Sequence, residues 1–288
     1  MRKLIPAILL LLLSAVLLST ASYAWFSMNT QVTATNMKVK AVAENGIVIS
    51  NTNKSTWAET ADAQINAAEI VPTSSASVVS PIWVHAVSTN ADEAQPQQAI
   101  VNYTELSLSW DTNNSEGIGY VDNDNSGTKN TGDTCYVLLN NFYIKSSADI
   151  INSTLYINDV TVTSSATGGS FNKLDNAVRV LIVVNNADAF VFAPVYNQAS
   201  STTTVDYKWK NTTNVKARYV GGTGEYSGYD VQCTSVTSIP NTDADAINVK
   251  IYMYFEGEDE NLKSTNIAGI SMNDLSLTVN FGTLAVHI

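Results

Sequence analysis

The sequence predicts an all-β protein: a two-sheet, jelly-roll-like sandwich with one or two short inserted helices, preceded by an N-terminal signal helix. Short segments of alternating or continuous apolar residues recur along the chain, and turn-rich segments separate them. Helical periodicity is confined to two short stretches, and no repeat of solenoid length occurs. We therefore expect one sandwich domain over residues 36–288.

Residues 1–24 have the pattern of a secretory signal peptide. Two basic residues precede an almost unbroken apolar run over residues 4–18, which is shorter than the roughly 18–20 residues of a membrane-spanning helix. Ser22 and Ala24 place small residues at the two positions that a signal peptidase requires. We expect cleavage after Ala24, so that the mature protein begins at Trp25 and meets the membrane only before processing. A retained N-terminal anchor is the alternative.

The segment 25–35 has the alternation of a two-faced strand, with apolar residues on one face and polar residues on the other. The parity changes at Asn36, where a second strand is expected to begin, because a strand cannot switch faces without a break. An N-terminal strand with one apolar stripe is suited to strand addition to another molecule. Pairing inside its own sheet is the alternative. The residues assigned to this donor strand are Trp25, Phe26, Met28, Thr30, Val32 and Ala34.

Short motifs around this segment carry a resemblance to a known family. They are SYAWFS at 22–27, VTATNMKV at 32–39, IVPTS at 70–74, and VKIY through FEGED at 249–259 followed by 270–281. These motifs resemble those of the TasA/camelysin family of secreted bacterial matrix proteins, although the Cys that often follows the Glu-Gly-x-Asp pattern is missing and Asn261 and Leu262 stand there. The resemblance implies a jelly-roll subunit whose mature N-terminus completes the sheet of a neighbouring subunit in an extracellular fibre.

Strand signals follow one another through the mature chain. They lie at 82–87, 103–110, 135–144, 154–162, 178–184, 190–195, 247–255 and 275–284. The best helical candidate is 57–70, which is rich in Ala and Glu, and 173–178 is a candidate for a single helical turn. The polar stretches 115–133 and 200–214 are expected to be long surface loops.

The composition is typical of an exported, acidic protein. The formal net charge is −11, and loss of the two basic residues of the leader would make it −13. This charge argues against nucleic acid and against anionic membrane surfaces as partners. We expect the protein to be secreted to the extracellular matrix or the cell surface of a bacterium.

Cys135 and Cys233 are the only cysteines of the chain. An even pair in an exported protein favours a disulfide, which would contribute roughly 4–5 kcal/mol by the chain-entropy estimate. Two buried free thiols are the alternative.

The loop 122–133 has the ligand spacing of a calcium-binding loop. Oxygen-bearing residues occupy positions 1, 3, 5 and 12, and a glycine that allows a sharp turn occupies position 6. These residues are Asp122, Asp124, Ser126, Asp133 and Gly127. Position 12 is Asp rather than Glu, position 8 is Lys129, and no helices are expected on either side. Calcium is the one cofactor that the sequence suggests, and an acidic hairpin loop is the alternative.

Catalysis finds little support in the sequence. The only histidines are His85 and His287, and neither lies in an H-E-x-x-H motif or near a G-x-S-x-G motif. The acidic residues between 256 and 260 are expected to form a solvated loop rather than a pair of catalytic carboxylates. We therefore expect no enzyme.

The sequence as a whole predicts a secreted structural subunit that polymerises into extracellular or biofilm-matrix fibres by N-terminal donor-strand exchange. Its partners would be further copies of itself, signal peptidase, and an accessory or anchoring subunit. The alternative is a monomeric cell-surface adhesin or carbohydrate-binding β-sandwich that stacks aromatic side chains on sugars. The candidate aromatic residues are Tyr207, Trp209, Tyr219, Tyr226 and Tyr229.

Overall fold

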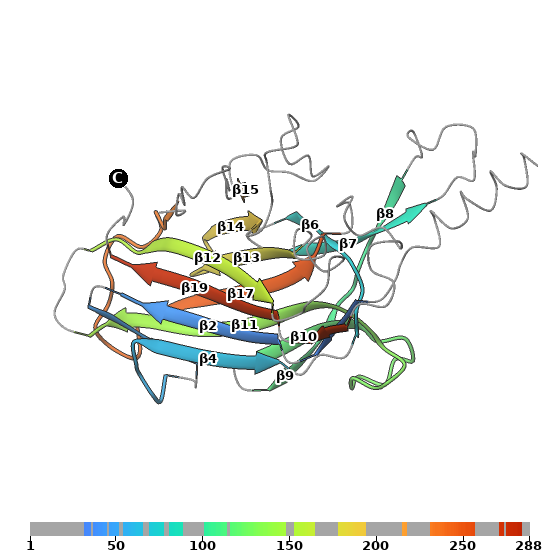
Figure 1. Cartoon of the computed structure of the whole chain (residues 1–288), viewed down its shortest axis with the longest axis horizontal. Helices are drawn as coiled ribbons and strands as arrows, with labels where there is room; N and C mark the ends of the chain where they lie inside the picture. Colours follow the sequence, from blue (N-terminus) through green and yellow to red (C-terminus); the bar gives the residue numbers. More distant parts are fainter. Residues whose placement is uncertain are drawn as a thin grey trace, which may run out of the picture.

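The computed structural model describes residues 32–35, 37–44, 46–51, 54–65, 69–77, 81–88, 101–113, 116–147, 153–164, 178–193, 215–217, 231–256, 271–273 and 275–283. Over these ranges the regular structure is β-strand throughout, and no helix is present. The strands form three sheets, of eleven, five and three strands (Figure 1). The two larger sheets pack face to face, which confirms the predicted all-β sandwich.

The strands in chain order are β1 (Val32–Thr35), β2 (Met37–Ala43), β3 (Ile47–Ser50), β4 (Thr60–Ile65), β5 (Glu69–Ile70), β6 (Ser74–Ser77), β7 (Ile82–Ser88), β8 (Val101–Glu105), β9 (Ser109–Asn113), β10 (Glu116–Val121), β11 (Thr134–Ser146), β12 (Tyr156–Ser164), β13 (Val178–Val184), β14 (Asp188–Ala193), β15 (Val215–Ala217), β16 (Val231–Gln232), β17 (Ile247–Phe255), β18 (Ser271–Asn273) and β19 (Leu275–Gly282).

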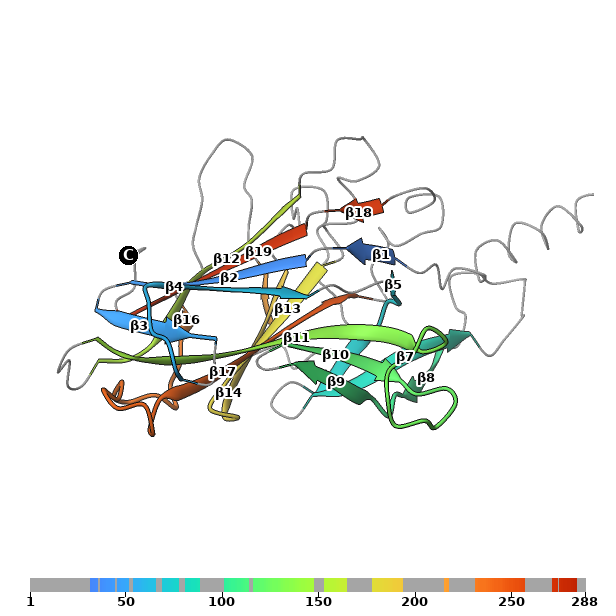
Figure 2. The same ribbon diagram turned by 90° about the horizontal axis from the view of Figure 1, so that it is seen from below.

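The five-stranded sheet has the order β16-β12-β19-β2-β4. The larger sheet runs β15-β14-β13-β17-β11-β5-β1-β18, with β3 and β10 also paired to β11, and β9 paired to β10. The third sheet is the meander β6-β7-β8. In Figure 2 it lies at one end of the molecule, near β9 and β10.

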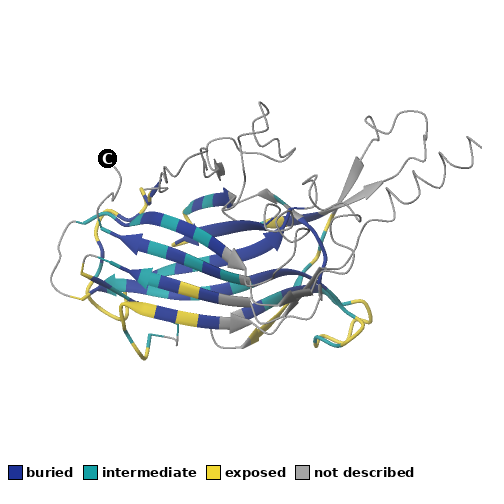
Figure 3. Ribbon diagram, viewed as in Figure 1, coloured by how far each residue is buried: buried dark blue, intermediate teal, exposed yellow. Residues whose placement is uncertain are grey.

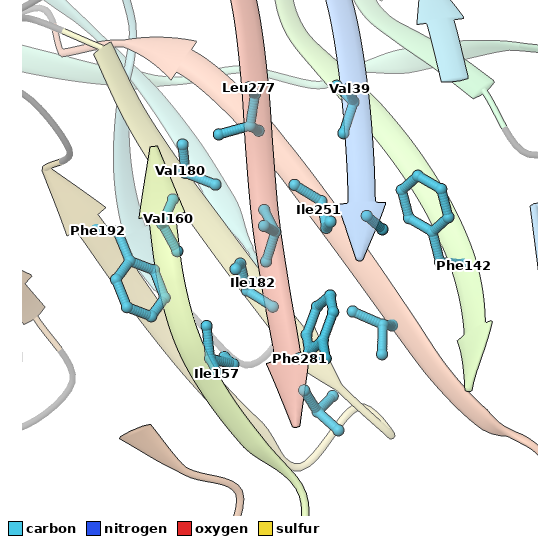
Figure 4. Packing of buried hydrophobic residues seen from close by; sticks show 14 of the residues in the cluster. Val39, Phe142, Ile157, Val160, Val180, Ile182, Phe192, Ile251, Leu277 and Phe281 are labelled. Carbon is cyan, nitrogen blue, oxygen red and sulfur yellow. The ribbon is translucent and has the colours of Figure 1, made fainter. Parts of the chain in front are cut away.

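The main core lies between the two larger sheets. Figure 4 shows side chains of both layers meeting there, among them Phe281 and Leu277 of β19, Ile251 of β17 and Phe142 of β11. Each of these four is fully buried. Burial of such a side chain contributes about 1.5–3 kcal/mol, so the facing apolar stripes account for the association of the sheets.

The second face of the larger sheet is also covered. All seven residues of β13 are buried: its even-numbered residues belong to the main core, whereas Leu181 and Val183 belong to a second apolar cluster with Trp83, Tyr252 and Val137. A strand that is covered on both faces loses its apolar-polar alternation, which explains the continuous apolar run at 180–184; Arg179 before it is a buried charged residue.

The predicted break at Asn36 is confirmed. The strands on its two sides belong to different sheets, β1 to the larger and β2 to the five-stranded one. Both run parallel to their C-terminal partners in one register, since Thr33 lies opposite Ser271 and Lys38 lies opposite Ser276. The pairs β1–β18 and β2–β19 are therefore two consecutive parts of one parallel ladder that changes sheet (Figure 2).

The helix predicted at 57–70 is wrong. Residues 60–65 form strand β4 along β2, and residues 69–70 form β5. Ala61 and Ala63 face the core with 7% and 3% exposure, whereas Asp62 between them is exposed, an alternation visible along β4 in Figure 3. Alanine is the best helix former, but intrinsic helix propensity is a weak preference, and the pairing with β2 overrides it.

The loop predicted at 115–133 begins later than expected, because its first part is strand β10, paired with β9 and β11. The alternating glycines of this strand weaken the apolar pattern that would have revealed it. The leader 1–24, the upstream part of the donor segment at 25–31, residues 173–177, the loop 200–214 and the five candidate adhesin aromatics lie outside the described residues.

Since the described part of the chain holds no helix, it offers none that is long and apolar enough to cross a membrane.

Candidate functional site

Strand β1 is the described part of the predicted donor strand, and it pairs inside its own chain. It lies parallel to β18 through three residue pairs and antiparallel to β5 through two. Val32 lies opposite Ile70, and Ala34 lies opposite Met272. The assignment of Val32 and Ala34 to a free donor strand is therefore corrected: the parallel ladder of β2 continues into β1, and pairing there satisfies backbone groups that would otherwise need a partner.

The attachment of β1 is nevertheless slight. Strand β2 has six residue pairs with β19 and six with β4, whereas β1 has five pairs in all. Its neighbour β5 is two residues long and meets β11 at the single pair Cys135 and Ile70. The sequence does not predict β5 or β18 as strands, because segments of two or three residues carry no periodic signal.

The calcium-like loop is the second candidate site, and the hairpin of β10 and β11 presents it. Val121 lies opposite Thr134 at the end of the ladder. Asp122, which follows β10, and Asp133, which precedes β11, therefore lie next to each other at the base of the loop. Oxygens of Asp122, Asp124 and Asp133 lie within 4.8 Å of one another. The structure thus brings together the three carboxylates that the spacing predicted.

Backbone N–H groups hold these carboxylates in place. Asp122 accepts hydrogen bonds from the amides of Ser126 at 3.1 Å and Gly127 at 2.7 Å. Asp133 accepts from the amides of Asn123 at 3.0 Å and Asn130 at 2.8 Å. Gly127 has a φ of 73°, which allows the turn that brings its amide to Asp122.

Asp124 and Ser126 complete the cluster. The amide of Ser126 donates to Asp124 at 3.0 Å, and the side-chain amide of Asn130 donates to the other oxygen of Asp124 at 2.9 Å. Hydrogen bonds from Ser126 are the largest cause that lowers the pKa of Asp124 below its usual value. Asn130 was not singled out from the sequence, although its place in an Asn- and Asp-rich loop is a signal for such side-chain bonding.

The donor set fits a hard divalent cation. Three carboxylates and the Ser126 hydroxyl offer the oxygen ligands that calcium prefers, and each carboxylate oxygen that accepts one N–H bond has a second lone pair. Carboxylates this close repel one another, and a cation between them would remove that repulsion.

The predicted disulfide is wrong: Cys135 and Cys233 are both buried free thiols. Cys135 lies at the start of β11. The backbone amide of Cys233 donates to the carbonyl of Leu155, and the segment that follows Cys233 reaches the far end of β11, where the amide of Ser146 donates to the carbonyl of Pro240. The thirteen residues of β11 span roughly 40 Å at about 3.3 Å each. A disulfide requires Cα atoms less than about 7 Å apart. Burial is the largest cause that raises the pKa of both thiols.

The other chemistry-bearing residues are not brought into a cluster among the described residues. His85 lies in β7 opposite Thr104 of β8, and His287 lies outside the described part. Glu256 is only 3% exposed and forms an isolated parallel β-bridge with Thr73. Its assignment to a solvated loop is therefore corrected, because this residue directly follows β17 and is still buried.

No family model, no curated protein and no solved structure matches this chain. Its likeness to the TasA/camelysin family therefore stays a prediction from short motifs.

Proposed function

We propose that the protein is a secreted structural subunit that assembles into extracellular fibres through the segment just before β1. The observation that carries this proposal is the place of β1: a four-residue strand that lies next to the last strand of the larger sheet and is held by five residue pairs. In this arrangement β1 anchors the segment in its own subunit. Residues 25–31 are then the part that pairs with the next subunit.

The chemistry of this segment supports the proposal. Phe26 and Met28 alternate with Ser27 and Asn29, so a strand formed here has one apolar and one polar face. Burial of each apolar side chain in a neighbouring subunit would contribute about 1.5–3 kcal/mol, and main-chain pairing would add to this. A leader cleaved after Ala24 would make the segment available only after export.

The test is a double substitution on each face of the segment. Phe26→Asp with Met28→Asp places two charges on the apolar face, and Ser27→Asp with Asn29→Asp places the same two charges on the polar face of the same strand. We expect the first variant to be secreted as soluble monomers without filaments, and the second to form filaments like the unmodified chain. Electron microscopy and size-exclusion chromatography of the secreted protein measure both outcomes. Filaments of equal abundance in the two variants would contradict the proposal.

A calcium-binding role for the loop 122–133 is a second proposal, favoured by the three carboxylates within 4.8 Å. Asp122, Asp124, Ser126 and Asp133 would hold the ion, which would tie the two strands of the hairpin together at its tip. Its role would be structural, because the ion would join the ends of two paired strands.

A further inference from the structure

A hollow of about 350 Å³ lies where the three-stranded sheet meets the outer face of the larger sheet. Strands β7 and β8 supply one wall through Ile82, Trp83 and Glu105. The face of the larger sheet supplies the other through Trp110 of β9 and Tyr252 of β17. Its size is at the lower end of the range of ligand sites in proteins, about 300–1,000 Å³.

The indole of Trp110 lines this hollow and is supported from below. Its six-membered ring lies over Gly119 of β10, since a Cβ placed on Gly119 would lie 3.1 Å and 3.2 Å from two of its carbons. The ring of Tyr252 meets it edge to face, with 6.0 Å between the centroids. The ring of Trp83 in turn packs on Tyr252, with 5.8 Å between the centroids, so these aromatic side chains are continuous with the second apolar cluster.

This well-supported ring is still open to solvent. Trp110 is 36% exposed and Ile82 is 40% exposed, and they are the large apolar side chains with most exposure among the described residues. An aromatic ring that is fixed on one side and open on the other gives a rigid stacking surface at low entropic cost.

The hollow also carries polar groups of both signs. Glu105 and Lys250 line it, and the Lys250 ammonium donates a hydrogen bond to the side-chain oxygen of Asn186 at 3.0 Å. A carboxylate accepts hydrogen bonds, and an ammonium donates them. The ligand that complements this set has an apolar face, a rim of groups that both donate and accept, and no net charge.

We propose that this hollow binds a pyranose unit of a neutral glycan. A pyranose ring has C–H groups on its face, which stack on an indole, and hydroxyls around its edge, which reach a carboxylate and an ammonium. The net charge of −11 disfavours an anionic polysaccharide.

A peptide strand fits the hollow less well. Trp110, Leu139 and Tyr252 lie on three different strands and share one face of the sheet, since Leu139 lies opposite Tyr252, and Trp110 lies opposite Gly119. The hollow thus crosses the strands rather than following one sheet edge, whereas an added strand runs along an edge and takes its affinity from main-chain bonds. A glycan needs no such bonds.

The experiment is isothermal titration calorimetry of the purified full chain with cellohexaose and with the hexamer of N-acetylglucosamine as probes. We expect at least one of them to bind when titrated to roughly 10 mM, an order of magnitude above a Kd of 1 mM. Trp110→Ala should weaken the affinity about tenfold or more, whereas Trp110→Phe should retain it within about threefold. Trp57→Phe is the matched control, because the ring of Trp57 lies 4.5 Å from Lys145 and does not line the hollow; it should bind like the unmodified chain.

Circular dichroism and thermal unfolding show whether each variant is folded. Glu105→Gln gives a second measurement at a position whose side chain is exposed and whose backbone pairing the substitution leaves unchanged. A loss of affinity in Trp110→Ala together with a weaker loss in Glu105→Gln supports the site. Absence of binding by the folded, unmodified chain to both oligosaccharides would overturn it. Equal affinity of Trp110→Ala and Trp57→Phe would do so too, as would binding of a peptide of residues 25–35 at the hollow while the sugars stay inert.

Discussion

Alanine at Gly119 and alanine at Gly117 should change the stability of this protein in opposite directions. Both glycines lie in β10 and point to the same side of the sheet, so the two variants make the same chemical change two residues apart. At Gly117 the new Cβ would lie 3.3 Å from a methyl carbon of Thr112, whose side chain is exposed and can move. At Gly119 it would lie 3.0 Å from Leu108 and 3.1 Å from the ring of Trp110, which is rigid.

The magnitudes follow from these contacts. Replacing glycine by alanine in a strand contributes about 0.5–1 kcal/mol through the unfolded chain. The new Cβ displaces the Trp110 ring from its contact with Gly119. If the ring then loses roughly 80 Å² of the 150–250 Å² that an aromatic side chain buries, the cost at about 25 cal/mol per Å² is roughly 2 kcal/mol. We therefore expect Gly117→Ala to be more stable than the unmodified chain by about 0.5 kcal/mol, and Gly119→Ala to be less stable by roughly 1 kcal/mol.

Urea unfolding followed by far-ultraviolet circular dichroism measures the free energies of unfolding. Acrylamide quenching of fluorescence measures the mean exposure of the five tryptophans. It should rise in Gly119→Ala, where the new Cβ displaces Trp110, and stay unchanged in Gly117→Ala. Equal stability of the two variants with equal quenching would refute the contact between the Trp110 ring and Gly119.

Two further predictions concern the loop and the thiols. Calcium at about one hundred times its Kd should raise the free energy of unfolding by about 2.7 kcal/mol. Asp133→Asn should abolish this gain, whereas Asp111→Asn, which changes an exposed acid of β9 outside the loop, should retain it. If calcium does not raise the melting temperature of the unmodified chain, the site is excluded. Burial raises the pKa of Cys135 and Cys233, so the folded chain holds these two thiol protons to a higher pH than the unfolded chain, which releases them above about pH 8.5. The free energy of unfolding should therefore fall as the pH rises from about 8 to 9.5, and Cys233→Ala should flatten that fall in urea titrations. A slope unchanged by Cys233→Ala would contradict the burial of this thiol.

The features that the sequence predicted correctly are those that neighbouring residues determine. The change of parity at Asn36 marks the change of sheet between β1 and β2, because side chains of a strand alternate with a fixed period of two. The cluster of Asp122, Asp124 and Asp133 was also predictable, since a hairpin loop of twelve residues can bring only its own carboxylates together.

The errors fall where a distant partner decided the outcome. Residues 60–65 have the composition of a helix, and β2 makes them a strand by pairing with them and by covering Ala61 and Ala63. Cys135 and Cys233 form an even pair in the sequence, but Cys135 lies at the start of β11, and Cys233 lies in a segment that contacts the other end of this strand. The number of cysteines in a sequence does not show how far apart they lie in the folded chain.

The chain by itself determined that it would be a β-sandwich, where its longest strands would lie and which loop would gather carboxylates, because hydrophobic periodicity and loop spacing are local properties. Only the tertiary structure decided that β1 pairs with β5 and β18, and that Trp83, Trp110 and Tyr252 meet around one hollow. These residues come from three separate segments, and the free energy that brings them together is the burial of apolar surface between sheets, which depends on the whole fold.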